Sequence, residues 1–284
     1  MKKGNLSNII LILILIAGLS LLVYPSFSDY WNSLHQSRAV ASYVETVTKL
    51  DNKEYERIWQ DALDYNTKLT ERENSYILPE ELTGEYNNLL NIGGNGIMGY
   101  IDIKSIGVNL PLYHGKSESV LQVAIGHLDW TSLPTGGAGT HCVVSGHRGL
   151  PSARLFTDLD QLDVGDTFVL NILDQVLTYE VDQIKIVEPH ETEDLLIQPG
   201  KDYCTLVTCT PYGINSHRML VRGERTDNIL ERKEIRVTAD ALQIEPIIVA
   251  PLVAAPILLV LLVVLLIPKP KSNHRKGDDD FDGL

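Results

Sequence analysis

The sequence predicts a mostly β protein whose core is a closed β-barrel with short helices. Three patterns lead to this prediction. From Ile97 onward, apolar residues recur at every second position in short runs separated by Gly, Pro and Asp clusters, which is typical of a barrel. Before them, residues 30–66 repeat apolar side chains at three- and four-residue steps, which indicates helix. An apolar stretch near each end adds two flanking transmembrane helices.

Both apolar stretches are long enough to span a bilayer. The first, residues 6–24, follows two lysines and shows no clear cleavage site, so we expect a retained anchor instead of a signal peptide. The second, residues 247–267, carries no charge and is followed by lysines and an arginine. Because basic residues stay on the cytoplasmic side, the pattern predicts a two-pass protein of the cell membrane with an extracellular central domain.

The helical segment is expected to contain two helices. Asp51-Asn52 interrupts the apolar repeat and supplies an N-cap for the second helix. We expect both helices to pack on the following domain, with Trp31 and Trp59 as packing anchors. Residues 68–84, with two glutamate pairs, a proline and a glycine, are expected to form an exposed loop.

The predicted strands lie between Ile97 and Arg225. The apolar face changes from odd to even positions at Lys104-Ser105, which a turn or bulge explains, and again at Asp182-Gln183, where we expect a bulge. Four further strands are predicted at residues 141–145, 167–173, 203–209 and 218–222. In this arrangement Cys209 ends one strand and Arg218 begins the next, so a short loop can bring the two side chains together.

Composition excludes some classes of function. The net charge of -13 argues against a nucleic-acid partner, because phosphate binding needs a basic surface. The three cysteines cannot all pair, so at least one is free; we expect Cys142 and Cys204 to be buried in strands and Cys209 to be reactive. No pair of histidines has the spacing of a zinc site, and we expect neither a metal nor another cofactor.

A cysteine, a histidine and an arginine suggest nucleophilic catalysis. A thiolate attacks an acyl carbon, an imidazole exchanges the protons, and a guanidinium stabilises the oxyanion. These residues lie in specific surroundings. SGHRGLPSA at residues 145–153, TLVTC at 205–209 and CTPYGIN at 209–215 resemble the characteristic motifs of sortases, and most closely those of class C, the pilin polymerases. The likeness extends from about Gly96 to Arg225 and implies a closed sortase-type barrel.

The resemblance implies the roles of individual residues. His147 is then the acid/base, Cys209 the nucleophile, and Arg218 the residue that binds the oxyanion or positions the substrate. We expect Thr208 and Thr210, which flank the nucleophile, to support the substrate or the oxyanion. The implied reaction cleaves a Leu-Pro-x-Thr-Gly sorting motif between Thr and Gly, and passes the acyl group to a lysine amine of an acceptor pilin.

The segment before the barrel departs from the class C pattern. Class C sortases usually carry a lid with an Asp-Pro-aromatic motif, and no Asp-Pro occurs in this chain. Asn74 and Tyr76 stand roughly where that motif would lie. Tyr76 can still cover the thiol, whereas the neutral Asn74 cannot make a charge-assisted contact, so we expect a weak latch or none.

Alternatives remain for the residues and for the function. His127 is the main rival to His147, and the other arginines that compete with Arg218 are expected to be surface or strand-edge charges: Arg148, Arg154, Arg222 and Arg225. The functional alternatives are a sortase that anchors surface proteins to the cell wall, a hydrolytic cysteine protease, and a membrane-tethered adhesion module without enzymatic activity.

The predicted domain organisation follows from these observations. It comprises a cytoplasmic end with a transmembrane helix at residues 1–25, a helical segment with a lid-like loop at 26–95, a sortase-type catalytic barrel at 96–226, a juxtamembrane segment at 227–245, a second transmembrane helix at 246–268 and a cytoplasmic tail at 269–284.

Overall fold

The computed structural model describes residues 3–71 and 76–228, so Asn74 and the predicted C-terminal span lie outside the described residues. The chain forms two compact units, and the boundary between them falls after Tyr24. The described part of the first unit is the start of helix α1 (Lys3–Val47), whose apolar side chains are exposed. This helix is long and apolar enough to cross a membrane, as residues 6–24 predict.

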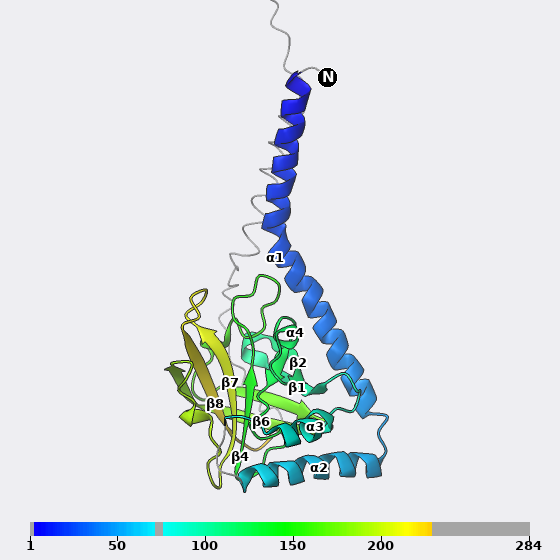
Figure 1. Ribbon diagram of the computed structural model, residues 1–284, viewed down its shortest axis with the longest axis vertical. Helices are drawn as coiled ribbons and strands as arrows, with labels where there is room; N and C mark the ends of the chain where they lie inside the picture. Colours follow the sequence, from blue (N-terminus) through cyan, green and yellow to red (C-terminus); the bar gives the residue numbers. More distant parts are fainter. Residues whose placement is uncertain (1–2, 72–75, 229–284) are drawn as a thin grey trace, which may run out of the picture. The chain divides into compact units, whose positions relative to one another are not determined.

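The second unit contains the barrel, which Figure 1 shows with its helices. Its strands are β1 (Ile97–Ile103), β2 (Val108–His114), β3 (Ile125–His127), β4 (Thr140–Ser145), β5 (Thr167–Ile172), β6 (Gln175–Val187), β7 (Asp202–Thr210) and β8 (His217–Arg225). Within the described residues they close in the order β1-β2-β3-β4-β7-β8-β6-β5, which confirms the predicted closed barrel. Two neighbouring pairs are parallel, β2 with β3 and β4 with β7.

Both changes of the apolar face have the expected structural causes. Between β1 and β2 lies the short 3-10 helix η1 (Lys104–Ile106), and Gly107 completes the turn with a left-handed φ of 64°. On β6, the register with β8 shifts between Val181 and Gln183, which confirms the bulge. After the bulge Ile184 packs against the main core, because the extra residue changes which positions of the strand face inward, whereas Ile186 near the strand end is 64% exposed.

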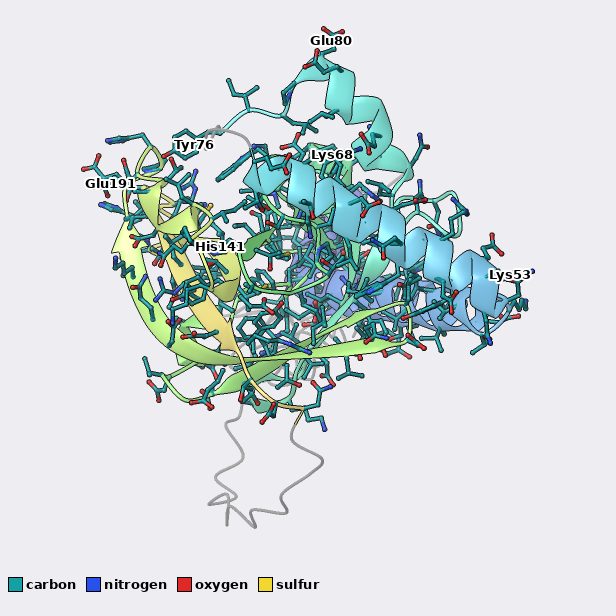
Figure 2. The ribbon with its side chains drawn as sticks, turned by 90° about the horizontal axis from the view of Figure 1, so that it is seen from below. Lys53, Lys68, Tyr76, Glu80, His141 and Glu191 are labelled. Atoms are coloured by element: carbon teal, nitrogen blue, oxygen red, sulfur yellow. The ribbon has the colours of Figure 1, made fainter. Side chains whose placement is uncertain are left out.

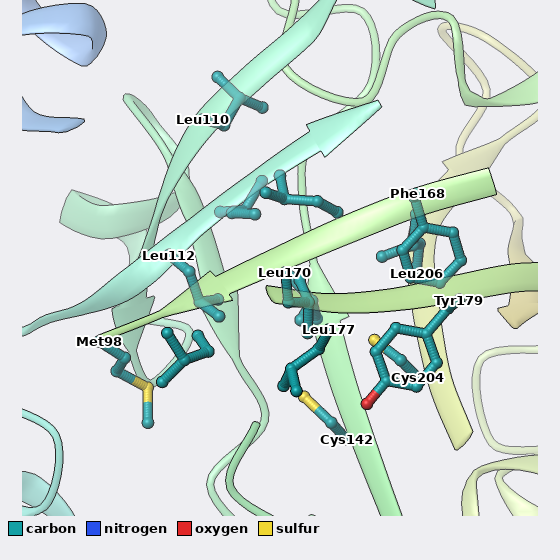
Figure 3. Packing of buried hydrophobic residues seen from close by; sticks show 14 of the residues in the cluster. Met98, Leu110, Leu112, Cys142, Phe168, Leu170, Leu177, Tyr179, Cys204 and Leu206 are labelled. Carbon is teal, nitrogen blue, oxygen red and sulfur yellow. The ribbon is translucent and has the colours of Figure 1, made fainter. Parts of the chain in front are cut away.

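The barrel interior holds the main apolar core. Figure 3 shows side chains from different strands meeting there, among them Met98 and Leu112 from β1 and β2, Phe168 from β5, and Tyr179 from β6. Cys142 on β4 and Cys204 on β7 belong to this core and are free thiols, as expected. Burial of this surface is the main force that closes the sheet.

Helices cover the barrel from outside. Helix α2 (Asn52–Thr70) begins at the predicted N-cap, where the Asp51 carboxylate accepts a bond from the Glu54 N–H. It crosses one end of the barrel, with Lys53 and Lys68 at its two ends (Figures 1 and 2). Asn66 fastens it there, because its amide donates to the Leu133 carbonyl at 3.0 Å and accepts from the Leu133 N–H at 2.7 Å.

Two expectations for the helical segment were wrong. Residues 68–84 were expected to form a loop, but residues 68–70 belong to α2, and helix α3 (Glu80–Asn88) begins at Glu80. Glu80 and Glu81 stand in the first turn of α3, where negative charge favours a helix, and Tyr86 is buried beneath it. The expected anchoring role holds for Trp59, which packs against the core, but not for Trp31, whose side chain is 55% exposed. Tyr43 anchors this part of α1, because its hydroxyl donates to the Met98 carbonyl and accepts from the Leu173 N–H.

Gly126 on β3 sits where the chain passes very close to the β2 end. A Cβ at this position would lie 2.1 Å from the Gly115 carbonyl oxygen, so Gly126→Ala should lower the free energy of unfolding by about 1–3 kcal/mol through overpacking. In the matched control Gly84→Ala on α3, a Cβ meets nothing within 4 Å, and removing a helical glycine should stabilise by about 0.5–1 kcal/mol. Urea unfolding measures both, and equal midpoints would contradict the argument.

Candidate active site

Parallel pairing of β4 with β7 brings the predicted histidine and cysteine to one end of the barrel. The register runs from Thr140 opposite Asp202 to Ser145 opposite Val207. It continues past the strand end, since the Gly146 N–H donates to the Val207 carbonyl at 3.0 Å. His147 is two residues beyond Ser145, as Cys209 is two beyond Val207, so the two residues reach the same level of adjacent chains.

The predicted arginine joins them from the other side. β8 is antiparallel to β7, and Cys209 lies directly opposite Arg218 in the register. The strand prediction is therefore confirmed: the cysteine lies at the end of one strand and the arginine at the start of the next. Three neighbouring strands, β4, β7 and β8, deliver the three predicted residues to one place.

Cys209 and Arg218 belong to the outer face of the barrel. Cys204 and Leu206 point into the main core, whereas Val207 packs in a second apolar cluster, and alternation places Cys209 on the side of Val207. This outer cluster consists of Leu128, Val143, Leu195, Val207 and Leu220, with Trp130 and Val187 packed against it. The Cys209 side chain is half-buried, so it is accessible beside an apolar surface.

The guanidinium of Arg218 is held by its own loop. Its Nη1 donates to the carbonyls of Asn215 at 3.2 Å and His217 at 3.1 Å. Within the described residues, no carboxylate forms an ion pair with Arg218. A cation held by neutral carbonyls keeps its charge available for an anion that forms beside Cys209.

In the described residues, one ring nitrogen of His147 makes no hydrogen bond. Its side chain is 29% exposed, and its Nε2 has no hydrogen-bond partner among the residues that the structure describes. The nearest carboxylate oxygen is Oε1 of Glu118, 3.9 Å away at the start of helix α4 (Glu118–Leu121). The preceding Gly146 is required by packing, because a Cβ there would lie 2.6 Å from the Phe156 ring.

The rival histidines have structural partners. His127 is fully buried, with its Nδ1 2.9 Å from the Tyr86 hydroxyl and its Nε2 2.8 Å from the Ser132 carbonyl. Burial lowers the pKa of His141 to about 4, and its ring bonds the Leu196 carbonyl and the Thr205 hydroxyl. Burial also lowers the pKa of His114. In residues 3–71 and 76–228, no group of three or more His, Cys, Asp or Glu is arranged to hold a metal ion.

Thr208 and Thr210 both take part in the framework of the site. The buried Thr208 hydroxyl donates to the Gly146 carbonyl at 2.8 Å, which ties β7 to the residue before His147. The Thr210 hydroxyl accepts a bond from Arg148 Nη1 at 3.3 Å. Their expected contact with substrate or oxyanion stays a prediction.

Arg148 is the residue whose position the sequence did not reveal. It was expected as a surface charge, but its side chain is only 10% exposed and pairs with Asp160. Because it follows His147 and its guanidinium reaches Thr210, which follows Cys209, it joins the histidine loop to the cysteine strand. Only the position of Arg148 next to His147 hinted at this, since its two partners are 12 and 62 residues away.

The lid candidate reaches the outer cluster. Tyr76 lies past the end of α2 (Figure 2). Its ring meets Trp130 edge-on, with centroids 5.4 Å apart. Trp130 packs on the cluster that includes Val207, two residues before Cys209. Tyr76 therefore contacts, through Trp130, the apolar cluster that lies on the same face of β7 as Cys209.

Known proteins are similar to this chain in sequence and in fold. Residues 101–226 match the sortase domain family. Sortase A of Bacillus anthracis is 25% identical over 224 residues, which are 79% of this chain and 96% of that protein. The crystal structure of sortase C1 from Streptococcus agalactiae is similar with a TM-score of 0.66 and 51% identity, covering 67% of this chain and 99% of that one. Sortase C of Clostridium perfringens, solved with the C-terminal cell wall sorting motif, is similar with a TM-score of 0.59 and 42% identity. The match covers 67% of this chain and 99% of that one.

Removing the Thr208 hydroxyl tests the link between β7 and the histidine loop. Thr208→Val leaves the buried Gly146 carbonyl without this donor, so the free energy of unfolding should fall by about 1–3 kcal/mol. Alkylation of Cys209 by iodoacetamide should change its rate as well, because the loop before His147 is released. In the control Thr67→Val, a similar bond on the exposed face of α2 is lost, and both quantities should hardly move. Unchanged values for Thr208→Val would contradict the link.

Proposed function

Because this chain belongs to the sortase family of cysteine transpeptidases, we propose that it is a class C enzyme that builds covalent pili. It cleaves a Leu-Pro-x-Thr-Gly-type sorting motif between Thr and Gly and joins the threonine to a lysine amine of another pilin. The observation that carries this proposal is the register of β4, β7 and β8, in which Cys209 faces Arg218 and His147 stands alongside. The class C relatives are similar over nearly their whole length, and sortase C of Streptococcus pneumoniae, which is described with its pilin substrate specificity, supports the choice of pilin as substrate.

The first half-reaction forms a thioester. The sorting motif lies along the outer apolar cluster, and the Cys209 sulfur, whose proton His147 holds, attacks the threonine carbonyl carbon as a thiolate. Arg218 stabilises the resulting oxyanion, since its guanidinium always carries charge. The bond to glycine breaks as His147 gives a proton to the departing amine, which leaves a thioacyl group on Cys209.

The second half-reaction releases the product. A neutral lysine amine attacks the thioester carbon, and His147 accepts the proton that this nitrogen loses. The carbon–sulfur bond breaks, so Cys209 is regenerated and an isopeptide bond joins the two subunits. The unpartnered Nε2 of His147 is consistent with a group that must exchange protons with successive substrates. Water has to be a poor competitor, because hydrolysis would discard the acyl group.

The membrane arrangement is part of the proposal. The two-pass topology places the catalytic barrel outside the cell, between an N-terminal anchor and the span at residues 246–268. In this arrangement the enzyme meets substrates that are themselves leaving the membrane. The described residues include one helix of this topology that is long and apolar enough to cross a membrane, namely α1.

A second candidate is a sortase that anchors surface proteins to the cell wall. The absence of any Asp-Pro dipeptide favours it, because the class C lid usually contains one. The acceptor would then be an amine of a peptidoglycan precursor. Both candidates share the thioacyl step, and the acceptor distinguishes them.

Mass spectrometry of the protein with a Leu-Pro-x-Thr-Gly peptide tests the shared step. We expect a thioacyl adduct on Cys209 that passes to a pilin-derived lysine amine when one is added. Cys209→Ala and His147→Ala should abolish turnover, and Arg218→Ala should reduce kcat by about 10²–10³-fold if it stabilises the oxyanion. The exposed His190 provides a control, since His190→Ala should leave activity intact.

The outcomes separate the candidates. Transfer to a peptidoglycan-type amine but not to lysine would favour wall anchoring, and release to water alone would favour a protease. Robust polymerisation by the Cys209 variant would overturn the mechanism.

Tyr76→Ala tests the lid. Loss of the ring contact with Trp130 should expose the surface beside Cys209 and speed its alkylation about 2- to 10-fold, as expected for an aromatic pair of about 0.5–1.5 kcal/mol. Val176→Ala removes an apolar side chain of similar exposure from β6 and should have no effect. A rate that is the same in both variants would show that Tyr76 does not limit access.

A further inference from the structure

Helix α1 has two different faces just after the apolar span. Asp29, Asn32 and Gln36 recur at helical spacing on one face, and each binds the catalytic end of the barrel. The Asp29 carboxylate accepts from the Arg154 N–H at 2.9 Å. The amides of Asn32 and Gln36 donate to the Ser152 carbonyl at 2.7 Å and to the Val123 carbonyl at 2.8 Å. This face therefore holds the loop that follows His147.

The opposite face carries a different set of side chains. Phe27, Trp31, His35 and Arg38, which we call the aromatic face, recur at steps of three and four residues and lie about half a turn away from Asp29. Neighbouring rings contact one another along the helix: Phe27 and Trp31 are stacked with centroids 6.3 Å apart, and Trp31 and His35 are tilted with centroids 5.0 Å apart. Phe27 is 61% and Trp31 55% exposed.

The composition of this face fits lipid headgroups. Aromatic rings are favoured at the boundary between hydrocarbon and water, and a guanidinium beyond them can meet lipid phosphates. The order along the chain agrees, since the apolar residues 6–24 come first, then Phe27 and Trp31, and then the exposed Arg38. The two rings expose roughly 250 Å² of surface, given about 150–250 Å² for each whole aromatic side chain. That is well below the roughly 800 Å² per partner of a stable protein interface.

We propose that residues 25–38 of α1 form an interfacial helix, with the aromatic face in the lipid headgroup layer and the opposite face bound to the loop after His147. A helix is about 10–12 Å across, so this arrangement keeps the catalytic loop about one helix diameter from the membrane surface. Pro25 stands at the start of the segment, where a helix can bend out of the direction of the span.

The consequence for catalysis rests on the proposed function. A sorting motif that emerges from the bilayer would meet Cys209 close to its point of exit. The enzyme would then act on membrane-held substrates at a high effective concentration, and it would use soluble peptides less well.

Tryptophan fluorescence in vesicles tests the position of the helix. The full chain is reconstituted in phosphatidylcholine and phosphatidylglycerol vesicles, with or without bromine on the acyl chains near the headgroup. Of the three tryptophans, Trp59 packs on the core and Trp130 on the outer cluster, so brominated lipid should remove up to about a third of the emission, through Trp31. The control Trp31→Phe/Val44→Trp moves the ring about 20 Å along the same helix and should show almost no quenching.

Each other outcome would overturn the interfacial helix. Equal quenching in both proteins would mean that the lipid does not select the aromatic face. Quenching of Trp31 by aqueous iodide but not by brominated lipid would mean that the face is solvated. Protection from both quenchers, together with a dimer in sedimentation, would mean that a second copy covers it.

A second measurement separates this inference from the proposed function. Phe27→Ser/Trp31→Ser should lower transfer from a sorting peptide that is anchored in the vesicle, and leave transfer from a soluble peptide unchanged. Equal effects on both peptides would overturn the consequence for catalysis. Failure of the wild type to form a thioacyl adduct with either peptide would count against the proposed function, while the quenching result would still decide the position of the helix.

Discussion

The parallel pairing of β4 with β7 is the constraint on which the site depends. Parallel neighbours keep corresponding residues at one end of the sheet, so residues 62 apart in sequence, such as His147 and Cys209, reach the same edge. β8 then returns antiparallel and places Arg218 opposite the cysteine. A slip of one residue in either pairing would turn the cysteine toward the core. The bond from Thr208 to Gly146 and the contact of Arg148 with Thr210 fix this register beside His147 and Cys209.

Much of the barrel could be predicted because its rules are local. Alternation with a period of two identifies a strand whose two faces differ, and the shift at Asp182-Gln183 marks a bulge without any knowledge of the partner strand. The N-cap at Asp51 is equally local, since its carboxylate binds an N–H only three residues away. The relation of Cys209 to Arg218 followed from the two strands that meet at a short loop.

The features that the sequence did not predict depend on contacts between distant segments. β3 has only three residues, too few for a visible alternation. α3 contains a glycine and lies in a polar stretch, and it gains from the burial of Tyr86, which reaches His127 in the barrel. An arginine next to a candidate catalytic histidine has no sequence pattern that reveals its burial, so the position of Arg148 emerges only when Asp160 and Thr210 are close in space.

The strength of the contacts on the outer face of the barrel determines how firmly a lid could be held there. A charged lid residue beside an arginine would contribute a bond of about 1.5–3 kcal/mol, whereas a neutral amide contributes about 0.5–1.5 kcal/mol. The contact between the rings of Tyr76 and Trp130 contributes a free energy in the lower range, about 0.5–1.5 kcal/mol. An interaction of that size shifts an equilibrium only about 2- to 10-fold, so a lid held by it alone would open often without any partner. Access to the thiol would then depend less on release of a latch than on delivery of the peptide to the outer cluster beside Cys209. The position of α1 at the loop after His147 bears directly on that delivery.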